Sequence, residues 1–532
     1  MKYRNKGQIS IFACLMLCAF LILILAVLQG IRMWEGRAKC SQAVTAATNS
    51  IKGDYQPDLF RRYHLIALDQ TYYGRGEGFL EERGKEYLEY NLNPANGLYH
   101  FNVDDVILAN TEALTDGDLS GLKQQIQEYM ELKLPVNVLE AVFNKVEGME
   151  NQDKQEEMIA ELEEIDGLTE TGFSVEAMES PTAETVRLLG LEELLANQGI
   201  TDFDNLSVED LLEMDLTGQD LILNPQTVME DMMNTEILYL VMPKQVSAVS
   251  KKTVDLQHIS SSNRIRDNQN RMWDVDRNIQ SVSDIAALCS EDVFQEPLNH
   301  IPTETDALYG IAYAMDSFQY FGNEFDTAEG VEPHVLEYEV EYILAGQESD
   351  YENLSRIAEE LCMIRFVPNA VYAFTDEEMK ETALLLAALL LAPVGLEGAA
   401  EPVSYVFLAC WAYAESIMDV RGLFQGDYVP LIKDKESWQL SLTGIQKLAT
   451  EEASGCEQTK GMNYEEYLMI LLGIMPNQNL KYYRMLDIIQ GNIQENIPEF
   501  KIENCIYEFQ LQVKIRENIH IWYLEREGSY LS

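Results

Sequence analysis

The hydrophobic positions of this chain form one long unbroken run, followed by several shorter periodic stretches. Residues 9–28 read ISIFACLMLCAFLILILAVL, with Ser10 as the only hydroxyl and no charge. The run extends to Ile31, and Arg32 ends it. About 20 apolar residues at a rise of about 1.5 Å just cross a hydrocarbon core of about 30 Å. The pattern predicts a transmembrane helix over residues 9–31, because it has no polar face of the kind that marks a helix in a soluble core.

The flanks of this run favour an uncleaved signal anchor. Residues 1–8 form a short basic tail, expected in the cytoplasm. No small-x-small cleavage site closes the run, since Gln29 follows Ala26-Val27-Leu28, and the run is longer than the apolar core of most cleaved signals. Basic residues are nearly balanced on the two sides, so charge alone gives little orientation. The short tail favours a single-pass protein of the cell membrane with a large extracellular C-terminal part.

The helix is expected to continue beyond the membrane as a stalk, within a first exported segment of residues 32–110. Gly53-Asp54 and Pro57 are expected to end it. Small and apolar residues recur along one helical face: Met33, Gly36, Cys40, Ala43, Ala47 and Ile51. Two interpretations of this stripe stay open, a stalk packed on its own domain or an interface within a larger assembly.

The middle of the chain divides into two segments. Residues 111–235 are strongly acidic and helical in pattern, which predicts a helical insertion. Residues 236–345 are expected to be mixed, with strands at Ile237–Met242 and at Leu336–Leu344. In the second of these, apolar residues alternate with glutamates, which predicts a half-buried strand with a solvated acidic face.

The last two segments combine helices with a closing sheet. Residues 346–455 are expected to be a helical core, with a long helix at 350–374 that is either continuous or broken near Pro368. The apolar runs at 383–396 and 403–418 are too short to span a membrane and favour buried helices over a membrane hairpin. Residues 456–532 are predicted to form two helices, at 464–472 and 484–493, and then two antiparallel strands, at 507–515 and 519–524. The predicted fold class is therefore α+β.

Composition and charge narrow the range of partners. The chain has 89 acidic and 38 basic residues, a formal net charge of −51 and a pI of about 4.3. Such a surface repels phosphate backbones, so no nucleic-acid binding is expected. The eight cysteines are scattered without a CxxC pair, which argues against a zinc ribbon. Cys456 and Cys505 could pair in an exported domain, although spacing alone does not show it.

One stretch partly matches a calcium-binding loop. Asp116, Asp118 and Ser120 occupy positions one, three and five, and Gly121 occupies the position of the turn glycine. Gln127 stands at the twelfth position, where a bidentate glutamate is expected. A second stretch, Asp202–Glu213, has the glutamate but lacks an inner ligand and the glycine. The favoured interpretation of both is a capped helix start.

Catalytic motifs are absent from the sequence. No HExxH, GxSxG or Walker loop occurs, and the six histidines never pair at metal-ligand spacing. Glu415 and Asp419 lie one helical turn apart, where a catalytic dyad is conceivable, but a helix-surface pair meeting Arg421 is favoured. The sequence therefore predicts a protein that is not an enzyme, with no catalytic residues, cofactor or metal.

Motifs at both ends carry a resemblance to a known family. They are Gln8-Ile9-Ser10-Ile11-Phe12 before the span, Tyr63-His64-Leu65-Ile66-Ala67-Leu68-Asp69 after it, Tyr338-Glu339-Val340-Glu341-Tyr342-Ile343-Leu344, Ser349-Asp350-Tyr351-Glu352-Asn353-Leu354, the stretch from Trp411 to Arg421, Val429-Pro430-Leu431, and Trp438. Together they resemble the large membrane-anchored TadE/TadG-like proteins of tight-adherence (Flp) pilus loci in Gram-positive bacteria. The chain departs from true Flp prepilins, which carry Glu five residues after the processing-site glycine, because Phe12 follows Gly7 at that spacing.

The resemblance implies a cell-surface component of a tight-adherence pilus system, minor-pilin-like or structural. Its partners would be the membrane, through residues 9–31, and pilus-system membrane proteins or pilins. It would act by helix packing and protein–protein interaction. The alternative from another functional class is an envelope-anchored hydrolase or a calcium-dependent surface binding module.

Overall fold

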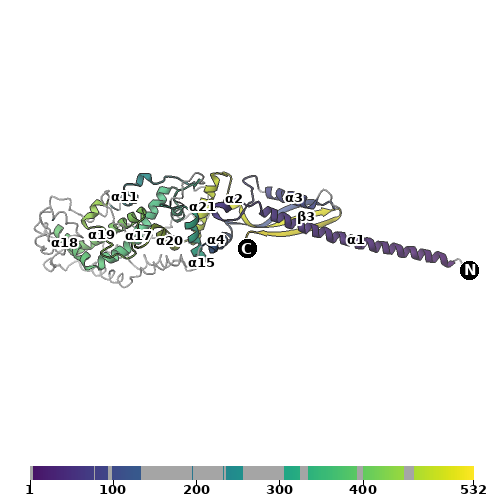
Figure 1. The fold of residues 1–532 in the computed structure, drawn as a ribbon, viewed down its shortest axis with the longest axis horizontal. Helices are drawn as coiled ribbons and strands as arrows, with labels where there is room; N and C mark the ends of the chain where they lie inside the picture. Colours follow the sequence, from purple (N-terminus) through teal and green to yellow (C-terminus); the bar gives the residue numbers. More distant parts are fainter. Residues whose placement is uncertain are drawn as a thin grey trace. The chain divides into compact units, whose positions relative to one another are not determined.

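The computed structural model describes residues 4–76, 78–93, 99–133, 235–255, 305–323, 333–391, 400–448 and 460–531, together with Met158, Leu195 and Met232. The chain divides into two compact units: unit 1 comprises residues 1–128 and 492–532, and unit 2 comprises residues 129–491 (Figure 1). The described residues combine helices with antiparallel strands, in agreement with the predicted mixed class. Most of the acidic insertion, Asp202–Glu213 and Cys456 lie outside the described residues.

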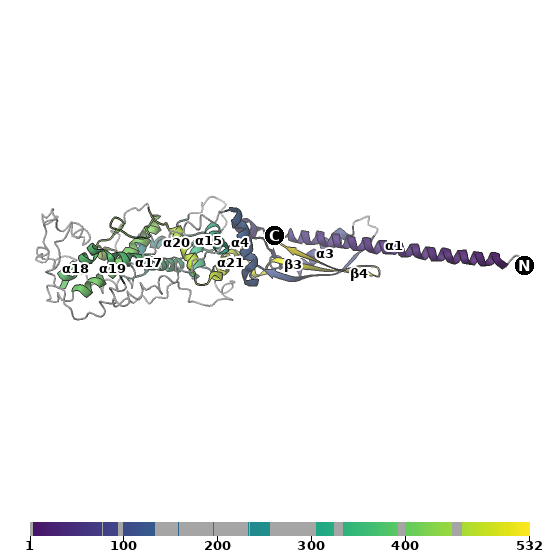
Figure 2. The ribbon, with the colours of Figure 1, turned by 90° about the horizontal axis from the view of Figure 1, so that it is seen from below.

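Unit 1 is built on one long helix, α1 (Arg4–Lys52), which joins the apolar run to the stalk without a break (Figure 2). This confirms the predicted continuity and the predicted end before Gly53. The apolar part has a mean hydropathy of 3.2 and none of it is buried. Within the part of the chain that the structure describes, α1 is the one helix long and apolar enough to cross a membrane.

A four-stranded antiparallel sheet packs beside the second half of α1. Its strands are β1 (Leu68–Asp69), β2 (Asn102–Ala113), β3 (Cys505–Glu517) and β4 (His520–Ser529). The central strand is β3: β2 pairs with it along one edge, and β4 and β1 pair with it as well. The sheet therefore joins the two ends of the chain, and the predicted C-terminal hairpin is confirmed.

The core of unit 1 lies between this sheet, α1 and α3 (Phe79–Leu92). Alternate residues of β3 face it, as the period of a strand requires. The buried core residues include Cys40, Ala43, Val44, Ala47 and Ile51 of α1, Leu80, Leu88 and Leu92 of α3, Val103 and Val106 of β2, and Phe509, Leu511, Val513 and Ile515 of β3. The small-residue stripe of the stalk thus faces its own unit. The packed-stalk interpretation is confirmed from Gly36 to Ile51, where the stripe is buried, whereas Met33 is 46 % exposed.

Short elements connect these parts of unit 1. They are α2 (Pro57–Tyr63), the 3₁₀ turns η1 (Gly117–Leu119) and η9 (Ile502–Asn504), and the helix α4 (Ser120–Lys133), which begins in unit 1. The side chain of Gln56 caps α2, and Pro57 occupies its first turn. Cys505 is buried at the start of β3. Because Cys456 lies outside the described residues, the pairing of the two cysteines stays a prediction.

The described part of unit 2 is helical. Its main helices are α15 (Thr305–Ser317), α16 (Glu339–Ala345), α17 (Asp350–Thr375), α18 (Glu377–Leu391), α19 (Ala400–Gln425), α20 (Tyr464–Ile474) and α21 (Gln478–Gln494), with shorter turns at α11 (Ile237–Val241), η4 (Val246–Ala248) and η8 (Thr443–Lys447). Pro368 lies inside α17 without ending it. Most residues of α18 and α19 are buried within the unit, which confirms core helices rather than a membrane hairpin.

Two predicted strands of unit 2 are wrong. Ile237–Met242 forms the short helix α11, and Leu336–Leu344 leads into the helix α16, in which Glu339 and Glu341 are both fully buried. In the first case, a short apolar run has no length or period that separates a strand from a buried helix. In the second, the alternation was misleading because Glu339 and Glu341 are buried hydrogen-bond acceptors rather than solvated side chains. The strand β2 was not predicted. Asn102–Ala113 contains acidic residues on its exposed side, and three shifts of register, one before Asp105 and one on each side of Glu112, break the alternation.

Replacing Gly36 with leucine should destabilise unit 1. A Cβ at Gly36 would lie 3.2 Å from two ring atoms of Trp522, so the larger side chain overpacks the contact between α1 and β4, at a cost of about 1–3 kcal/mol. Thermal unfolding of the full-length protein in detergent, followed by tryptophan fluorescence, measures the change.

Gly30→Leu is the matched control for this substitution. A Cβ at Gly30 meets no heavy atom within 4 Å. Both substitutions raise helix propensity by about 0.8–1 kcal/mol, so the difference between the two variants isolates the packing against Trp522. Equal stabilities for the two variants would contradict the described packing of α1 on the sheet.

Candidate functional site

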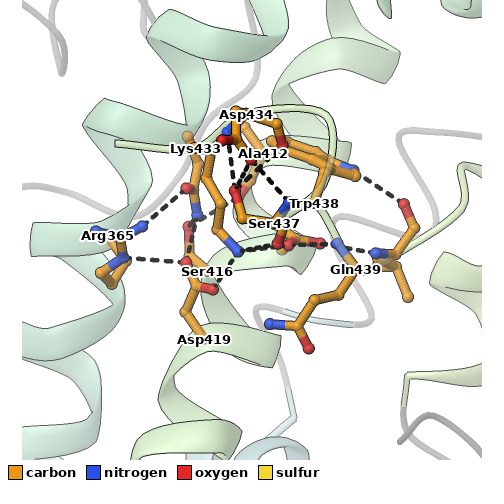
Figure 3. A network of polar contacts seen from close by, with 12 residues as sticks. Arg365, Ala412, Ser416, Asp419, Lys433, Asp434, Ser437, Trp438 and Gln439 are labelled. Carbon is orange, nitrogen blue, oxygen red and sulfur yellow. Dashed lines mark hydrogen bonds and ion pairs between the residues drawn. The ribbon is translucent and has the colours of Figure 1, made fainter. Parts of the chain in front are cut away.

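The interior of unit 2 holds a cluster of four charged side chains (Figure 3). Helix α17 contributes Arg365, helix α19 contributes Glu415 and Asp419, and the segment that follows α19 contributes Lys433. Charged side chains are almost never fully buried unless they are paired. All four are 0–2 % exposed, so the cluster must satisfy its charges internally.

Lys433 bridges the two carboxylates. Its Nζ lies 2.8 Å from Glu415 Oε1 and 2.7 Å from Asp419 Oδ1, and it donates a hydrogen bond of 3.0 Å to the carbonyl oxygen of Ser437. The contact with Asp419 Oδ1 is an ion pair whose direction departs from that of a hydrogen bond. The attraction is strong because the low-dielectric interior screens it far less than water does.

Arg365 neutralises the other side of Asp419. Its Nε donates to Asp419 Oδ2 at 3.0 Å, and Asn369 Nδ2 donates to the same oxygen at 3.0 Å. The remaining guanidinium nitrogens donate to the Leu431 carbonyl at 3.0 Å, to the Tyr467 hydroxyl at 3.2 Å and to Asn369 Oδ1 at 3.2 Å. The planar fork of an arginine suits such a set of fixed acceptors.

Glu415 fixes the backbone of the segment after α19. Its Oε1 accepts a hydrogen bond from the Gln439 amide at 2.8 Å, and its Oε2 accepts one from the Leu440 amide at 2.9 Å. The Leu440 carbonyl in turn accepts from the indole N–H groups of Trp411 at 2.7 Å and Trp438 at 2.9 Å. The two indole rings meet edge to face with centroids 5.5 Å apart.

The two carboxylates respond differently to this environment. Burial raises the pKa of Glu415, and repulsion from Asp419 adds to the rise against the attraction of Lys433. Burial also opposes ionisation of Asp419, but Lys433 and Arg365 together hold the pKa of Asp419 below its ordinary value. Burial disfavours the charge on Lys433 as well, yet Asp419 and Glu415 raise the pKa of its ammonium. Asp419 and Lys433 are therefore a charged pair at neutral pH.

The cluster joins three parts of unit 2 through directional contacts. It connects α17, α19 and residues 431–440. Carboxylates act in acid–base chemistry where a substrate can reach them. With side-chain exposures of 0 % for Arg365, Asp419, Glu415 and Lys433, no atom of these groups is open to a substrate in this conformation. Its evident role is to fix the arrangement of the helices and of the segment after α19.

The prediction for Glu415 and Asp419 is wrong in two respects. Both side chains are buried rather than on the helix surface, and their partners are Lys433 and Arg365 rather than Arg421. Arg421 instead donates to the backbone carbonyls of Leu240 and Leu448. The spacing of one helical turn was right, but it does not identify partners that come from another helix and from a loop.

A second polar centre lies around the buried glutamate Glu341 of α16. Its Oε1 accepts hydrogen bonds from the Tyr464 hydroxyl at 2.7 Å and from the Phe321 amide at 2.9 Å, while Oε2 has no hydrogen-bond partner among the described residues. The rings of Phe321, Tyr338, Phe424 and Tyr464 contact one another beside it, with centroids 5.2–6.1 Å apart. Burial raises the pKa of Glu341 to about 7, although its hydrogen bonds oppose the rise.

The neighbouring Glu339 supports the same segment of backbone. Its Oε2 accepts a hydrogen bond from the Gln319 amide at 2.9 Å, and its Oε1 lies 2.8 Å from His334 Nδ1. The two glutamates thus hold the amides that follow α15 in place. The sequence predicted that the carboxylates of Glu339 and Glu341 face solvent. That prediction is wrong, because both are buried and accept hydrogen bonds.

The calcium-loop candidate forms a turn between β2 and α4. Asp116 Oδ2 accepts a hydrogen bond from the Ala113 amide at 3.0 Å, and Gly117 and Asp118 have φ values of 56° and 57°. Ser120 begins α4, as the helix-start interpretation predicted. Among the described residues, no group of three or more His, Cys, Asp or Glu side chains could hold a metal ion.

The fold and the buried clusters define a class of protein with one apolar N-terminal helix, a sheet unit built around that helix and a helical unit braced by internal charges. The chain belongs to the family of unknown function DUF5702, whose model matches residues 217–517, more than half of the chain. The match includes Arg365, Asp419, Lys433 and Glu341 and ends at the last residue of β3. No curated protein and no solved structure matches the chain significantly.

Lys433→Met should strongly destabilise unit 2. The substitution leaves two buried carboxylates facing each other, and removing one partner of a buried ion pair costs about 3–5 kcal/mol. Denaturant unfolding of the full-length protein in detergent can be followed by the fluorescence of Trp411 and Trp438, which lie beside the cluster. Adding Glu415→Gln to Lys433→Met should recover part of the loss, because it removes one of the two buried negative charges and its amide oxygen keeps one of the two backbone hydrogen bonds.

The exposed Glu436→Gln is the control for the cluster, with an expected effect within about 0.5 kcal/mol. A Lys433→Met protein as stable as this control would mean that the cluster does not hold unit 2 together.

The stability of unit 2 should fall with rising pH because of Glu341. Its pKa is about 7 in the folded protein against 4.5 for an ordinary glutamate, so the folded state binds the proton more tightly than the unfolded state. Its contribution is fully present below about pH 4.5 and is lost as pH rises through 7, by roughly 3 kcal/mol in total. Relative to Glu341→Gln, the wild-type free energy of unfolding should therefore decline between pH 5 and 8.

The same pH series on Glu436→Gln separates this effect from general titration. Glu436 is exposed, so this variant serves as the reference for the series. A flat difference for Glu341→Gln would show that Glu341 does not take up its proton on folding.

Proposed function

We propose that the protein is a membrane-anchored structural component of the cell surface, a minor-pilin-like subunit of a tight-adherence pilus system. In this proposal it is not an enzyme and acts through helix packing. Residues 9–31 lie in the membrane, the short N-terminal tail is cytoplasmic and the rest of the chain is extracellular. The partners are pilus-system membrane proteins or pilins.

The observation that carries the proposal is the division of α1 into two halves with different surroundings. The N-terminal half is apolar and exposed along its whole length, while the C-terminal half is built into the core of unit 1. Because the helix is continuous from Arg4 to Lys52, a contact made by the first half is transmitted mechanically to the sheet. A subunit that joins an assembly through its membrane helix requires such a rigid link.

The continuity of α1 also favours an anchor over a cleaved signal. The helix runs through Gln29, Gly30 and Ile31 without a turn or an extended segment, and the sequence there offers no small-x-small site. The first contact of the exported part with α1 follows at once, as the ion pair between Arg32 and Glu517 at 2.8 Å.

The surface available for assembly is narrower than the sequence alone suggested. Gly36, Cys40, Ala43 and Ala47 are used inside unit 1. The small residues of the span remain exposed, and they are Cys14, Ala19, Ala26 and Gly30. In lipid, small residues let helix backbones approach closely, where packing rather than hydrophobicity drives association.

The buried clusters support a structural rather than a catalytic role. The polar groups around Lys433 are closed to solvent, and their ion pairs hold α19 and the segment that follows it together. Among the described residues, neither the hydrolase alternative nor the calcium-module alternative gains an observation in its favour.

Gly30→Leu should weaken association with pilus-system proteins without unfolding the exported part. The leucine blocks close approach at a position where a Cβ meets no heavy atom of the described residues within 4 Å. Crosslinking in membranes followed by affinity capture measures the association, and protease added to wall-stripped cells should still release the large extracellular part. Leu25→Ile, which conserves volume on the same exposed helix, is the control.

Two results would contradict the proposal. The first is unchanged piliation and adherence on deletion of the gene, together with the absence of any pilus-system protein from the captured material. The second is full protease protection of the residues beyond Arg32, which would reverse the orientation.

A further inference from the structure

The hairpin that joins β3 to β4 has an exposed apolar tip. Ile519 is 82 % exposed, Tyr523 is 72 % exposed and Ile521 is 47 % exposed, and we call these three residues the hairpin tip. Ile521 and Tyr523 share one side of β4, and Ile519 lies in the turn that precedes the strand. Trp522 and Leu524, on the other side of β4, pack against the core of unit 1. Large apolar side chains exposed together at the end of a hairpin indicate a surface that contacts something apolar.

Contacts within unit 1 fix the level of the hairpin tip along α1. At one end of β4, the Tyr530 hydroxyl donates a hydrogen bond of 2.8 Å to the Lys52 carbonyl. Further along, the Trp522 ring lies against Gly36. Figure 2 shows the strands lying along the second half of α1, with the hairpin end directed toward the N-terminal half.

The spacing of these contacts shows that β4 runs alongside the helix axis. From Gly36 to Lys52, α1 advances by about 24 Å, and from Trp522 to Tyr530 the strand advances by about 26 Å. From Trp522, two further residues of strand, about 7 Å, lead to His520, the first residue of β4, and Ile519 follows in the turn. On α1 the same distance from Gly36 corresponds to four to five residues at about 1.5 Å each, which places this end of the hairpin level with about Arg32.

An independent contact gives the same level. Glu517, which pairs with His520 across the hairpin, forms an ion pair of 2.8 Å with Arg32. Arg32 is the first charged residue after the apolar run. Ile519 therefore lies level with the end of the apolar run, and Ile521 and Tyr523 lie level with the first turns of α1 after it.

Side chains of α1 at this level have the composition of a membrane interface. Trp34 is 77 % exposed and Met33 is 46 % exposed, next to the basic residues Arg32 and Arg37. Tryptophan and tyrosine are enriched where a membrane meets water, and basic side chains there reach lipid phosphates. The hairpin tip adds Tyr523 and two isoleucines to the same belt, with Lys514 close to the Tyr523 ring.

We propose that the hairpin tip inserts into the headgroup region of the membrane that α1 crosses, so that unit 1 contacts the lipid surface at a second point beside its helix. The partner is the lipid bilayer itself. Ile519 and Ile521 would contact the boundary of the acyl chains, and the neighbouring cationic side chains would contact the headgroup phosphates. Two separate contacts fix the rotation of unit 1 about the axis of α1, which a single helix leaves free. The inference rests on the proposed placement of residues 9–31 in the membrane.

Spin labels in the reconstituted full-length protein test the inference. Cys14, Cys18, Cys289 and Cys456 are replaced by serine, while Cys40, Cys362, Cys410 and Cys505 remain because they are buried. A nitroxide is then attached to Ile519→Cys in vesicles of phosphatidylcholine and phosphatidylglycerol. Its accessibility to oxygen, which concentrates in lipid, is compared with its accessibility to a water-soluble nickel chelate.

Two control positions accompany the label at 519. Ile107→Cys replaces an isoleucine that is 43 % exposed and pairs with Gln512, about 17 Å along the strands from the hairpin end. Native Cys18, kept as the single reactive cysteine, reports on the span. The expected result is a high oxygen-to-nickel ratio at 18, a clearly raised ratio at 519 and an aqueous ratio at 107.

Each other outcome overturns the inference in a distinguishable way. A lipid signal at 18 with an aqueous signal at 519 would refute the docking of the hairpin tip and leave the anchor intact. An aqueous signal at 18 would refute the anchor as well. A label at 519 that is shielded from both reagents would show that protein, such as a second copy of the chain, covers the hairpin tip.

Discussion

The close packing of the second half of α1 on the sheet is the contact on which unit 1 depends. The sheet can approach α1 closely because that face of the helix carries the small side chains of Gly36, Cys40, Ala43 and Ala47. The Trp522 ring packs against Gly36. The same helix continues as the apolar run, so the residues that hold the sheet and the exposed apolar residues belong to one continuous helix. Any role of the span in assembly is thereby coupled to the position of the sheet.

Unit 2 is held together on a different principle. Its helices bury Arg365, Asp419, Lys433 and Glu415, whose desolvation opposes folding unless every partner is present. Such a cluster adds little net stability over an apolar core, but it accepts only one arrangement of α17, α19 and the segment after α19. The hydrogen bonds of Glu415 to two backbone amides extend that selectivity to a loop that has no helix or strand of its own to fix it.

The sequence predicted the parts of the fold that local periodicity encodes. The long α1, the C-terminal hairpin and the helices from α17 to α21 follow from apolar repeats that the surroundings do not override. The strand β2 and the helix α16 were not predicted, because each depends on partners hundreds of residues or a whole helix away. Half of the charge cluster could be predicted from the sequence, because Glu415 and Asp419 lie one helical turn apart. Lys433 lies in a loop and Arg365 in another helix, so no spacing rule connects them.

The position of β3 at the centre of the sheet has a consequence for how the protein is made. The chain emerges N-terminus first, and about 450 residues separate the end of α1 from the start of β3. At about 5–20 residues per second, the central strand of the sheet follows α1 by roughly 20 to 90 seconds. During that interval α3 and β2 are the parts of the unit 1 core that have already been made, and the positions that β3 and β4 fill are still open. The core of unit 1 is therefore completed only by the last residues to be synthesised.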